Sequence, residues 1–210
     1  MGTEPERRRY NSLRRMNQAH QTRAEIADAA RRLFVDHGWA ATTVRDVARE
    51  AGVSVPTVYA AYQNKPGLVW ALVEATGVAA DLSRMIDELE RTADPRQNLA
   101  AMAAFDRRAF ERSGDLIALV REAGRTEPDL ADFYQRARRQ ADQTRVEVFT
   151  DWPAGTLRQD LDIPTAVDVY AALCNIDVYT TLTVERSWPA ERVERWWSES
   201  LARELLARPE

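Results

Sequence analysis

The spacing of apolar residues along the chain predicts helices almost throughout. The first example lies between Thr22 and Gly38, where apolar residues recur at intervals of three and four, as on one buried face of a helix. These apolar positions are Ile26, Ala29, Ala30, Leu33 and Phe34. Thr22 and Glu25 have the spacing of a capping box, and Gly38 is a suitable helix stop. Because no segment alternates as a strand does, the expected fold class is all-α, with about nine helices.

Two short helices joined by a tight turn are predicted next. Thr43 and Asp46 have the spacing of a second capping box, and the helix that they begin ends at Gly52. Ser54 caps the following helix, in which Pro56 is tolerated because a first-turn proline lacks only an unused N–H. In a helix-turn-helix the first helix braces the second, whose N-terminal residues reach base edges in the major groove. The alternative is an ordinary helical hairpin without this role.

The remainder of the chain is predicted to consist of longer helices. A proline or a capping residue marks the start of most of them, and an apolar stripe follows it. The expected segments are a helix from Asn64 through Ile86, helices over 95–110, 116–123 and 128–150, a loop over 151–164, a helix from Pro164 through Leu182, and a last helix from Pro189 with Ser187 as its cap. The predicted organisation is a basic arm over residues 1–20, a helix-turn-helix domain over 21–66 and a helical domain over 67–210.

The net charge of −4 is unevenly distributed. The first 70 residues contain 11 Lys and Arg against 7 Asp and Glu, whereas the other 140 contain 18 against 26. A basic first third on an acidic body suggests that only the N-terminal part meets a polyanion. Residues 1–20 are polar and arginine-rich and show no sustained apolar period, so they are expected to be disordered. This arm either enters a neighbouring minor groove of DNA or serves only as a solubilising tail.

Several classes of protein find no support in the sequence. No stretch approaches the roughly 18 uncharged apolar residues that span a bilayer, and the N-terminus has no secretory signal, so a cytoplasmic protein without a membrane partner is expected. The single Cys174 cannot form an internal disulfide. The histidines are His20 and His37 alone, and no HExxH, CxxC, GxSxG or glycine-rich phosphate loop occurs. The expectation is no enzyme, no metal and no cofactor, with a helical enzyme as the alternative from another class.

The segment from Ile26 to Val69 closely resembles the DNA-binding head of TetR-family regulators. The matching positions form an ordered series, namely Ala29-Ala30, Leu33-Phe34, Gly38, Thr42-Thr43-Val44, Val47-Ala48, Ala51-Gly52-Val53-Ser54, Thr57, Tyr59, Tyr62, Lys65 and Leu68. The series covers about a fifth of the chain, and the remainder matches the family only as a run of helices. The resemblance implies a three-helix DNA-binding head followed by a helical bundle for ligand binding and dimerisation.

The resemblance also implies which side chains face DNA and which form the core of the head. The implied DNA-binding set is Thr43, Ser54, Val55, Pro56, Thr57, Tyr59, Ala60 and Lys65, with Thr43 and Lys65 on phosphates. Val58 and Tyr62 are implied to be core residues. The sequence departs from the family pattern at Val55, Pro56, Ala60 and Ala61, where polar, basic, glycine or aromatic residues are common. Fewer hydrogen bonds to bases are therefore expected, although small apolar residues can contact thymine methyls.

In the resembled family the C-terminal bundle holds a small molecule. The candidate lining residues here are Met85, Met102, Phe105, Arg121, Trp152, Tyr170, Cys174 and Asn175, each of which could instead belong to the core or to an interface. The last two helices are expected to form a homodimer interface through Tyr170, Leu173, Asp177, Thr180, Thr181, Trp196, Leu201, Leu205 and Leu206. Two heads about 34–36 Å apart would read a palindromic, double-stranded operator DNA.

The resulting hypothesis is a DNA-binding transcriptional regulator, in this family most often a repressor, that a small-molecule effector of unknown identity releases from its operator. The alternative is a DNA-binding regulator without a small-molecule effector, whose body binds a protein partner or only dimerises.

Overall fold

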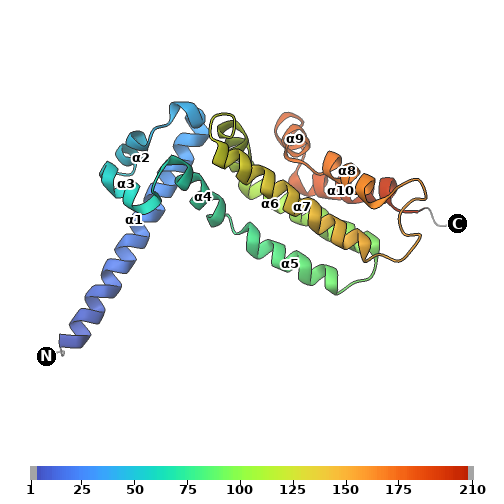
Figure 1. Ribbon diagram of the computed structural model, residues 1–210, viewed down its shortest axis with the longest axis horizontal. Coiled ribbons are helices and arrows are strands. Elements are labelled where there is room, and N and C mark those ends of the chain that lie inside the picture. Colours follow the sequence, from blue (N-terminus) through green and yellow to red (C-terminus); the bar gives the residue numbers. More distant parts are fainter. Residues whose placement is uncertain (1–3, 208–210) are drawn as a thin grey trace. The chain divides into compact units, whose positions relative to one another are not determined.

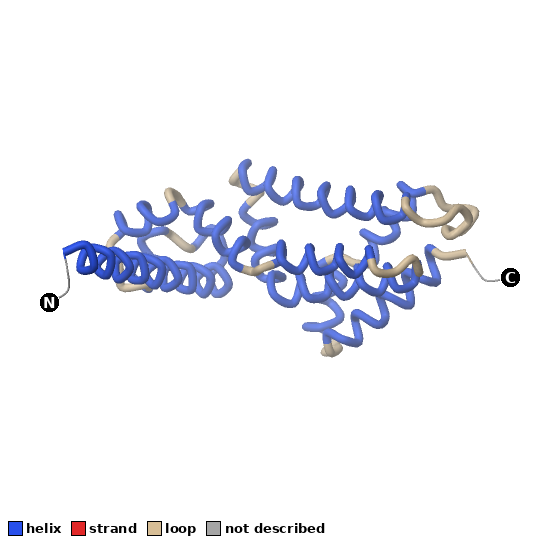
Figure 2. The backbone as a smooth tube through the Cα atoms, turned by 90° about the horizontal axis from the view of Figure 1, so that it is seen from below, coloured by secondary structure: helices blue, strands red, loops and turns tan. Residues whose placement is uncertain are grey.

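The computed structural model describes the backbone of residues 4–207 and the side chains of residues 18–207 other than Ala79. Within this range helices predominate, and extended residues pair only in an isolated bridge between Leu157 and Leu206 (Figure 2). The all-α prediction is therefore confirmed. The chain divides into two compact units, Met1–Ala75 and Thr76–Glu210. The sequence had suggested a division after residue 66, so the structure assigns one more helix to the first unit.

The first helix of the N-terminal unit is longer than the apolar pattern suggested. Helix α1 spans Glu4–Ala41 (Figure 1). It is broken at Gly38, whose φ of 76° and ψ of 176° are not helical. Gly38 is thus the stop that the sequence predicted, whereas Thr22 lies inside the helix. The expected disorder over residues 1–20 does not hold for residues 4–20, and residues 1–3 lie outside the described residues. Residues 6–31 contain neither glycine nor proline and are rich in Arg, Ala and Gln, which favour helix without a buried face.

The two short helices and their caps are present as predicted. Helix α2 spans Val44–Glu50 and helix α3 spans Val55–Tyr62. Thr43 and Asp46 form the reciprocal capping box, and the Ser54 hydroxyl accepts a hydrogen bond from the Thr57 amide at 3.3 Å. Between the helices Gly52 has a φ of +65°, a conformation that glycine adopts without the steric cost of a side chain. Local sequence alone therefore specifies both helix starts and the turn.

Helix α4, Lys65–Ala75, completes the N-terminal unit. The Asn64 side chain accepts a hydrogen bond from the Gly67 amide at 2.7 Å, which confirms Asn64 as its cap. A side chain at Gly67 would overlap the Tyr62 carbonyl oxygen, so only glycine fits the tight connection from α3. The core of this unit is made of side chains from all four helices, namely Ile26, Ala29, Ala30, Phe34, Trp39, Val47, Ala48, Val58, Leu68, Val69 and Leu72.

The C-terminal unit is a bundle around one long helix. Its elements are α5 (Val78–Glu90), α6 (Pro95–Ala123), α7 (Pro128–Thr150), α8 (Ile163–Leu173), α9 (Ile176–Thr180), a π-helical turn η1 (Thr181–Glu185) and α10 (Ala190–Leu205). Helix α6 packs against α5, α7, α9 and α10 (Figure 1). Its buried positions recur every three or four residues from Asn98 to Ala123. The stripe therefore faces several neighbours along its whole length.

Four helix boundaries differ from those that the sequence suggested. The expected helix from Asn64 to Ile86 is interrupted at Gly77, whose φ of +70° separates α4 from α5. The segments 95–110 and 116–123 are one helix, because burial of both apolar stripes offsets the roughly 1 kcal/mol that Gly114 costs inside a helix. The helix expected from Pro164 ends at Leu173, with Cys174 as its C-cap, rather than at Leu182. Ser187 has a φ of 55° and does not cap α10.

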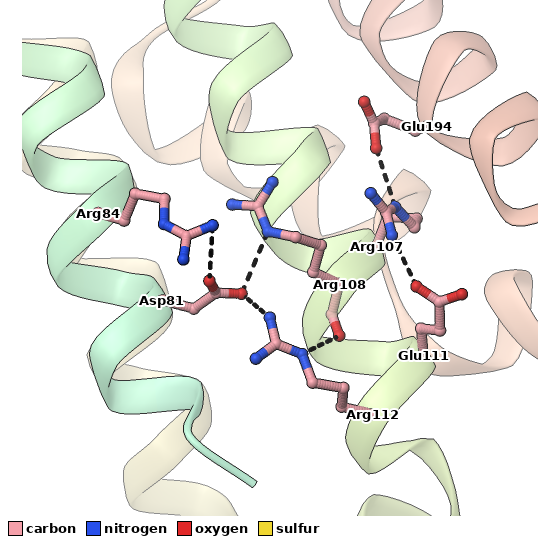
Figure 3. Close-up of polar contacts among 7 residues, drawn as sticks. All are labelled: Asp81, Arg84, Arg107, Arg108, Glu111, Arg112 and Glu194. Carbon is pink, nitrogen blue, oxygen red and sulfur yellow. Dashed lines mark hydrogen bonds and ion pairs between the residues drawn. The ribbon is translucent and has the colours of Figure 1, made fainter.

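Two clusters of charged residues connect helices of the C-terminal unit (Figure 3). Asp81 of α5 is buried and pairs with Arg84 of its own helix and with Arg108 and Arg112 of α6. The Asp81–Arg108 distance is 3.1 Å. Arg107 of α6 lies between Glu111 of the same helix and Glu194 of α10, at 2.6 Å and 2.9 Å. Side-chain ion pairs thus supplement apolar packing on two sides of α6.

Among the residues that the structure describes, no helix combines the length and the apolar character that crossing a membrane requires.

Candidate nucleic-acid interface and internal pocket

Helix α3 separates buried from exposed side chains sharply. Val58 points into the core of the unit and is 1% exposed, whereas the neighbouring Tyr59 is 49% exposed. Ser54, Pro56 and Ala60 are also exposed. Because successive helical residues are rotated by about 100°, the first turn and the Tyr59–Ala60 step form one outward surface. We call this surface, made of Ser54, Val55, Pro56, Thr57, Tyr59 and Ala60, the α3 face.

The polar groups of the α3 face are few. The Ser54 and Thr57 hydroxyls lie 2.7 Å apart and share a hydrogen bond. The Tyr59 hydroxyl is a further polar group, and its residue is about half exposed. Pro56 and Ala60 contribute only apolar atoms. The face therefore offers hydroxyl groups and small apolar surfaces rather than charged side chains, as the departures from the family pattern suggested.

Thr43, at the start of α2, is exposed but already hydrogen-bonded within the head. Its amide donates to Asp46 Oδ2 at 3.1 Å, and its hydroxyl accepts from the Asp46 amide at 3.2 Å. The hydrogen bonds from Thr43, together with the nearby Arg49, hold the pKa of Asp46 below its usual value. The negative charge of Asp46 thus stays at the helix N-terminus, where it stabilises α2.

Lys65 has a partner that the sequence did not predict. Its ammonium group donates a hydrogen bond to the Trp39 carbonyl and lies over the Trp39 ring, 3.8 Å from the ring centre. The Trp39 ring stacks on Phe34 at 5.6 Å. Lys65 therefore ties α4 to the break in α1, in addition to any role toward phosphate that the resemblance implies.

The C-terminal unit contains a pocket of about 290 Å³. Helices α5, α6, α7 and α8 each contribute to its walls. Its lining residues are Val78, Leu82, Met85, Met102, Phe105, Asp106, Ala109, Ala137, Gln140, Ala141, Thr144, Arg145 and Tyr170. A mostly apolar cavity with a few polar groups is typical of sites for small organic molecules.

Four of the eight lining residues predicted from the sequence line this pocket. They are Met85 of α5, Met102 and Phe105 of α6, and Tyr170 of α8. All four come from apolar stripes that face the same interior. Helical periodicity was sufficient to find them, although it could not distinguish cavity lining from filled core.

The other four predicted residues do not line the pocket, and each has a structural role instead. Arg121 makes two hydrogen bonds of 2.8 Å to the Asp177 carboxylate. Asn175 caps α9, and the Trp152 indole donates to Asn98 at 3.0 Å. Cys174 is buried in the core, where burial raises the pKa of its thiol well above the usual value. Arg121 lies in α6, whereas Trp152, Cys174 and Asn175 lie between helices, where helical spacing does not predict the direction of a side chain.

The sequence prediction missed the charged residues of the pocket. Asp106 of α6 accepts a hydrogen bond from the Tyr170 hydroxyl at 2.9 Å, and Arg145 of α7 lies 3.6 Å from the same carboxylate oxygen. The Arg145 guanidinium also lies over the Tyr170 ring, 4.5 Å from its centre. Burial raises the pKa of Asp106 although the Arg145 charge and the Tyr170 hydrogen bond act against it. One signal was present in the sequence, since Asp106 follows Met102 and Phe105 at helical spacing on an otherwise apolar stripe.

The predicted dimer-interface residues fall into two groups. Tyr170, Leu201 and Leu205 are at most 1% exposed within their own unit, and Leu206 is 7% exposed, so their side chains belong to the core and not to an interface. The other predicted residues retain exposed surface, namely Leu173, Asp177, Thr180, Thr181 and Trp196. Trp197 is fully buried while its neighbour Trp196 is not, which matches the expectation that the two rings serve different faces.

Across the described side chains, no three His, Cys, Asp or Glu residues are grouped so that they could hold a metal ion.

Comparison with known families identifies the N-terminal unit. Residues 26–72 match the model described as bacterial regulatory proteins, tetR family. The HTH-type transcriptional regulator TtgR of Pseudomonas putida is 38% identical over 82 residues, which are 39% of this chain and 39% of TtgR. The HTH-type transcriptional repressor KstR2 of Rhodococcus jostii is 30% identical over 101 residues, 48% of each chain. The match thus spans less than half the length of these relatives.

Solved structures resemble a larger part of the chain. A transcriptional regulator from Saccharomonospora viridis, solved in complex with choline, superposes with a TM-score of 0.71 at 20% identity, covering 90% of this chain and 100% of that one. NalD of Pseudomonas aeruginosa, the secondary repressor of the MexAB-OprM multidrug efflux pump, gives a TM-score of 0.68 at 19% identity, covering 90% and 98%. At these identities the likeness establishes a shared fold for both units.

Proposed function

We propose that this chain, which belongs to the TetR family of transcriptional regulators, is a repressor that binds operator DNA as a homodimer and is released by a small molecule. In this proposal the α3 face enters the major groove, helices α8 and α10 with η1 contribute to the dimer surface, and the pocket of the C-terminal unit takes the effector.

The observation that carries the DNA-binding part is the α3 face. Its exposed side chains lie on the second helix of a helix-turn-helix that matches the family model. The first helix, α2, is fixed to α1 by burial of Val47 and Ala48 and by an Arg32–Glu50 ion pair of 3.3 Å. A rigidly braced and exposed helix is what insertion into a groove requires.

The composition of the α3 face indicates how it would read DNA. Apolar atoms of Pro56 and Ala60 suit contact with thymine methyl groups, and the Tyr59 hydroxyl can bond to a base or to a phosphate. With no charged side chain on the face, sequence discrimination would rest on few contacts. A greater share of the affinity would then come from phosphate contacts elsewhere on the head.

Repression and effector release are supported more indirectly. Repressors are among the relatives, and the pocket has a size and lining suited to a small organic molecule. Release requires that the effector favour a conformation of the dimer that does not bind DNA, and near-complete release needs a preference of about 5.5 kcal/mol.

A second function is consistent with one observation in the pocket. Asp106, Arg145 and Tyr170 contact one another, as the members of a self-sufficient polar core would. In that case the chain would be a DNA-binding regulator without a small-molecule effector, whose body binds a protein partner or only dimerises.

Selection of binding sites from random double-stranded DNA tests the proposal. The full-length protein should enrich palindromic sites whose half-sites lie about 34–36 Å apart on the duplex, because two α3 helices of a dimer must enter successive major grooves. Failure to enrich any sequence at physiological salt would contradict operator binding. A selected site that no small molecule releases would favour the regulator without an effector.

A further inference from the structure

The charged side chains of the pocket lining are Asp106 and Arg145. They come from facing helices, α6 and α7, and the remaining polar lining residues are Gln140, Thr144 and Tyr170. Any ligand of this pocket must meet these groups, so the way in which they pair with one another limits the charge that the ligand can carry.

Arg145 is closely held by a carboxylate outside the pocket. Its guanidinium donates to Asp142 at 2.7 Å, one turn earlier on α7, whereas its distance to Asp106 is 3.6 Å. The Tyr170 ring covers one side of the same guanidinium. The positive charge of Arg145 is therefore shared between two carboxylates, and the nearer of these is Asp142.

The negative charge of Asp106 is balanced less completely by its neighbours. It is buried, and its two contacts are a neutral hydroxyl donor, Tyr170, and an ion pair of 3.6 Å with Arg145, which is longer than the 2.7 Å bond from Arg145 to Asp142. Both contacts are made by Oδ2, one of the two oxygens of the carboxylate. A buried carboxylate is stable as an anion only when positive charge or hydrogen-bond donors surround it. Within the lining one carboxylate meets one guanidinium, and that guanidinium also serves Asp142, so the negative charge of Asp106 is only partly neutralised.

We propose that the effector is an apolar organic cation whose protonated amine lies against the Asp106 carboxylate, with its hydrocarbon part between α5 and α7. This inference rests on the proposed effector function of the same pocket, and it assigns the chemical class of the ligand.

The rest of the lining fits the hydrocarbon part of such a ligand. Val78, Leu82 and Met85 of α5 line the pocket together with Ala137 and Ala141 of α7. These side chains offer no hydrogen bonds and gain from contact with apolar surface. The Phe105 ring of α6 also lines the pocket, next to Asp106 in the sequence. Apolar side chains thus make up most of the lining, beside the polar group formed by Asp106, Arg145 and Tyr170.

Ligands of the opposite charge fit less well. A carboxylate in the pocket would lie near Asp106, and like charges at short distance in a buried site repel strongly. The positive charge of Arg145 is already shared between Asp142 and Asp106, so it would attract a third carboxylate less strongly. A neutral alcohol can donate to Asp106 but adds no charge, so its hydrogen bond is weaker than that of an amine.

Calorimetric titration with octylammonium, octanol and octanoate tests the inference, because the three compounds share one tail and differ in head group. Octylammonium should bind at least about tenfold more tightly than octanol at neutral pH, and octanoate should bind most weakly. Equal affinities, or tighter binding of octanoate, would overturn the assignment.

The variant Asp106→Asn removes the charge while keeping a polar side chain of the same size. It should abolish the preference for octylammonium over octanol. Asp87→Asn, on the exposed side of α5, makes the same change in net charge outside the pocket and should retain the preference. A preference that survives in a folded Asp106→Asn protein would contradict a role for this carboxylate.

A pH titration of the unmodified protein covers the case in which Asp106→Asn does not fold. Arg145 of α7, Tyr170 of α8 and Cys174, the C-cap of α8, interact with Asp106 and keep their charge state in acid. Helix α5 contributes only Val78, Leu82 and Met85 to the lining. Affinity for octylammonium should therefore fall as Asp106 gains a proton, and affinity for octanol should not. Parallel loss of both affinities would contradict the inference.

The same compounds separate this inference from the proposed function. If octylammonium binds more tightly than octanol and octanoate but does not release the selected DNA, the ligand class is supported and the effector role is contradicted. DNA release by all three compounds alike would support the effector role and contradict the ligand class.

Discussion

At the scale of single residues, exposure on α3 distinguishes two aromatic side chains that look alike in the sequence. The Tyr62 hydroxyl donates to the Arg23 carbonyl at 2.7 Å, which ties α3 to α1. The pKa of Tyr62 is raised, mainly because the side chain is partly buried. Tyr59 instead presents about half of its surface to solvent, one turn earlier on the outer side. Tyr62 therefore holds the head together, and Tyr59 is available to a partner.

The substitution Tyr59→Ala should weaken binding to a selected operator by about tenfold without changing thermal stability, because an exposed ring contributes contacts to DNA but little to the fold. Fluorescence anisotropy with labelled DNA measures the affinity. Tyr134→Ala, which truncates a partly exposed tyrosine of the C-terminal unit, is the matched control. An operator affinity that stays the same in Tyr59→Ala would remove this residue from the DNA contacts.

At the scale of secondary-structure elements, the attachment of α5 to α6 depends on one buried carboxylate. Asp81 faces Arg84, Arg108 and Arg112, and these guanidinium groups would repel one another without it (Figure 3). Because α5 and α6 both line the pocket, this contact helps to hold two of its walls together.

The substitution Asp81→Asn should lower the free energy of unfolding by about 2 kcal/mol at neutral pH, since it leaves partly buried guanidinium groups without their anion. Thermal or urea unfolding of the C-terminal unit measures the change. Asp87→Asn on the exposed side of the same helix should change stability by less than about 0.5 kcal/mol. Equal stabilities for the two variants would show that apolar packing alone attaches α5.

The same contact predicts a direction for the dependence on pH. Burial would raise the pKa of Asp81, but the hydrogen bond from Arg108 and the charges of Arg108, Arg112 and Arg84 outweigh it and lower the pKa. A carboxylate with a lowered pKa in the folded state contributes its full stability above its unfolded value of about 4. That contribution is lost as the pH falls through the lower, folded value. The stability difference between wild type and Asp81→Asn should therefore shrink in acid.

At the scale of the whole molecule, the proposed mechanism requires a dimer, and core burial restricts where its surface can be. Leu201 and Leu205 are buried within their own unit, so in the proposed dimer α10 would contact the partner through other residues. Val184, on the π-helical turn η1 that precedes α10, is an aliphatic side chain that remains 73% exposed. Such π-helical turns often lie at functional sites. We therefore place η1 in the proposed dimer surface.

The substitution Val184→Arg should weaken dimerisation at least about tenfold, because an interface that buries an aliphatic side chain would have to bury a charge instead. Sedimentation velocity over a range of concentrations measures the equilibrium. Ile86→Arg, at a 41% exposed aliphatic residue of α5, is the control for an added surface charge. An unaltered dimer in Val184→Arg would exclude η1 from the interface.

The sequence by itself determined the local structure of the head. Thr43, Ser54, Asn64, Gly38 and Gly52 act through hydrogen bonds or backbone conformation within a few residues, so their spacing is enough to specify the helix starts and turns. The apolar stripes specified an all-α fold and half of the predicted pocket lining for the same reason, since a stripe reports which face of a helix is buried.

Only the tertiary structure decided which distant groups meet. The sequence places Asp106, Arg145 and Tyr170 on three separate helices, and nothing in their local spacing indicates that they converge on one cavity. The same holds for Lys65 with the Trp39 carbonyl, and for Arg121 with Asp177. Leu201 and Leu205 were expected at an interface because periodicity identifies a buried face but not whether the chain itself or a second copy covers it. Helix packing settles that question, since it fixes the distance and direction between side chains far apart in the sequence.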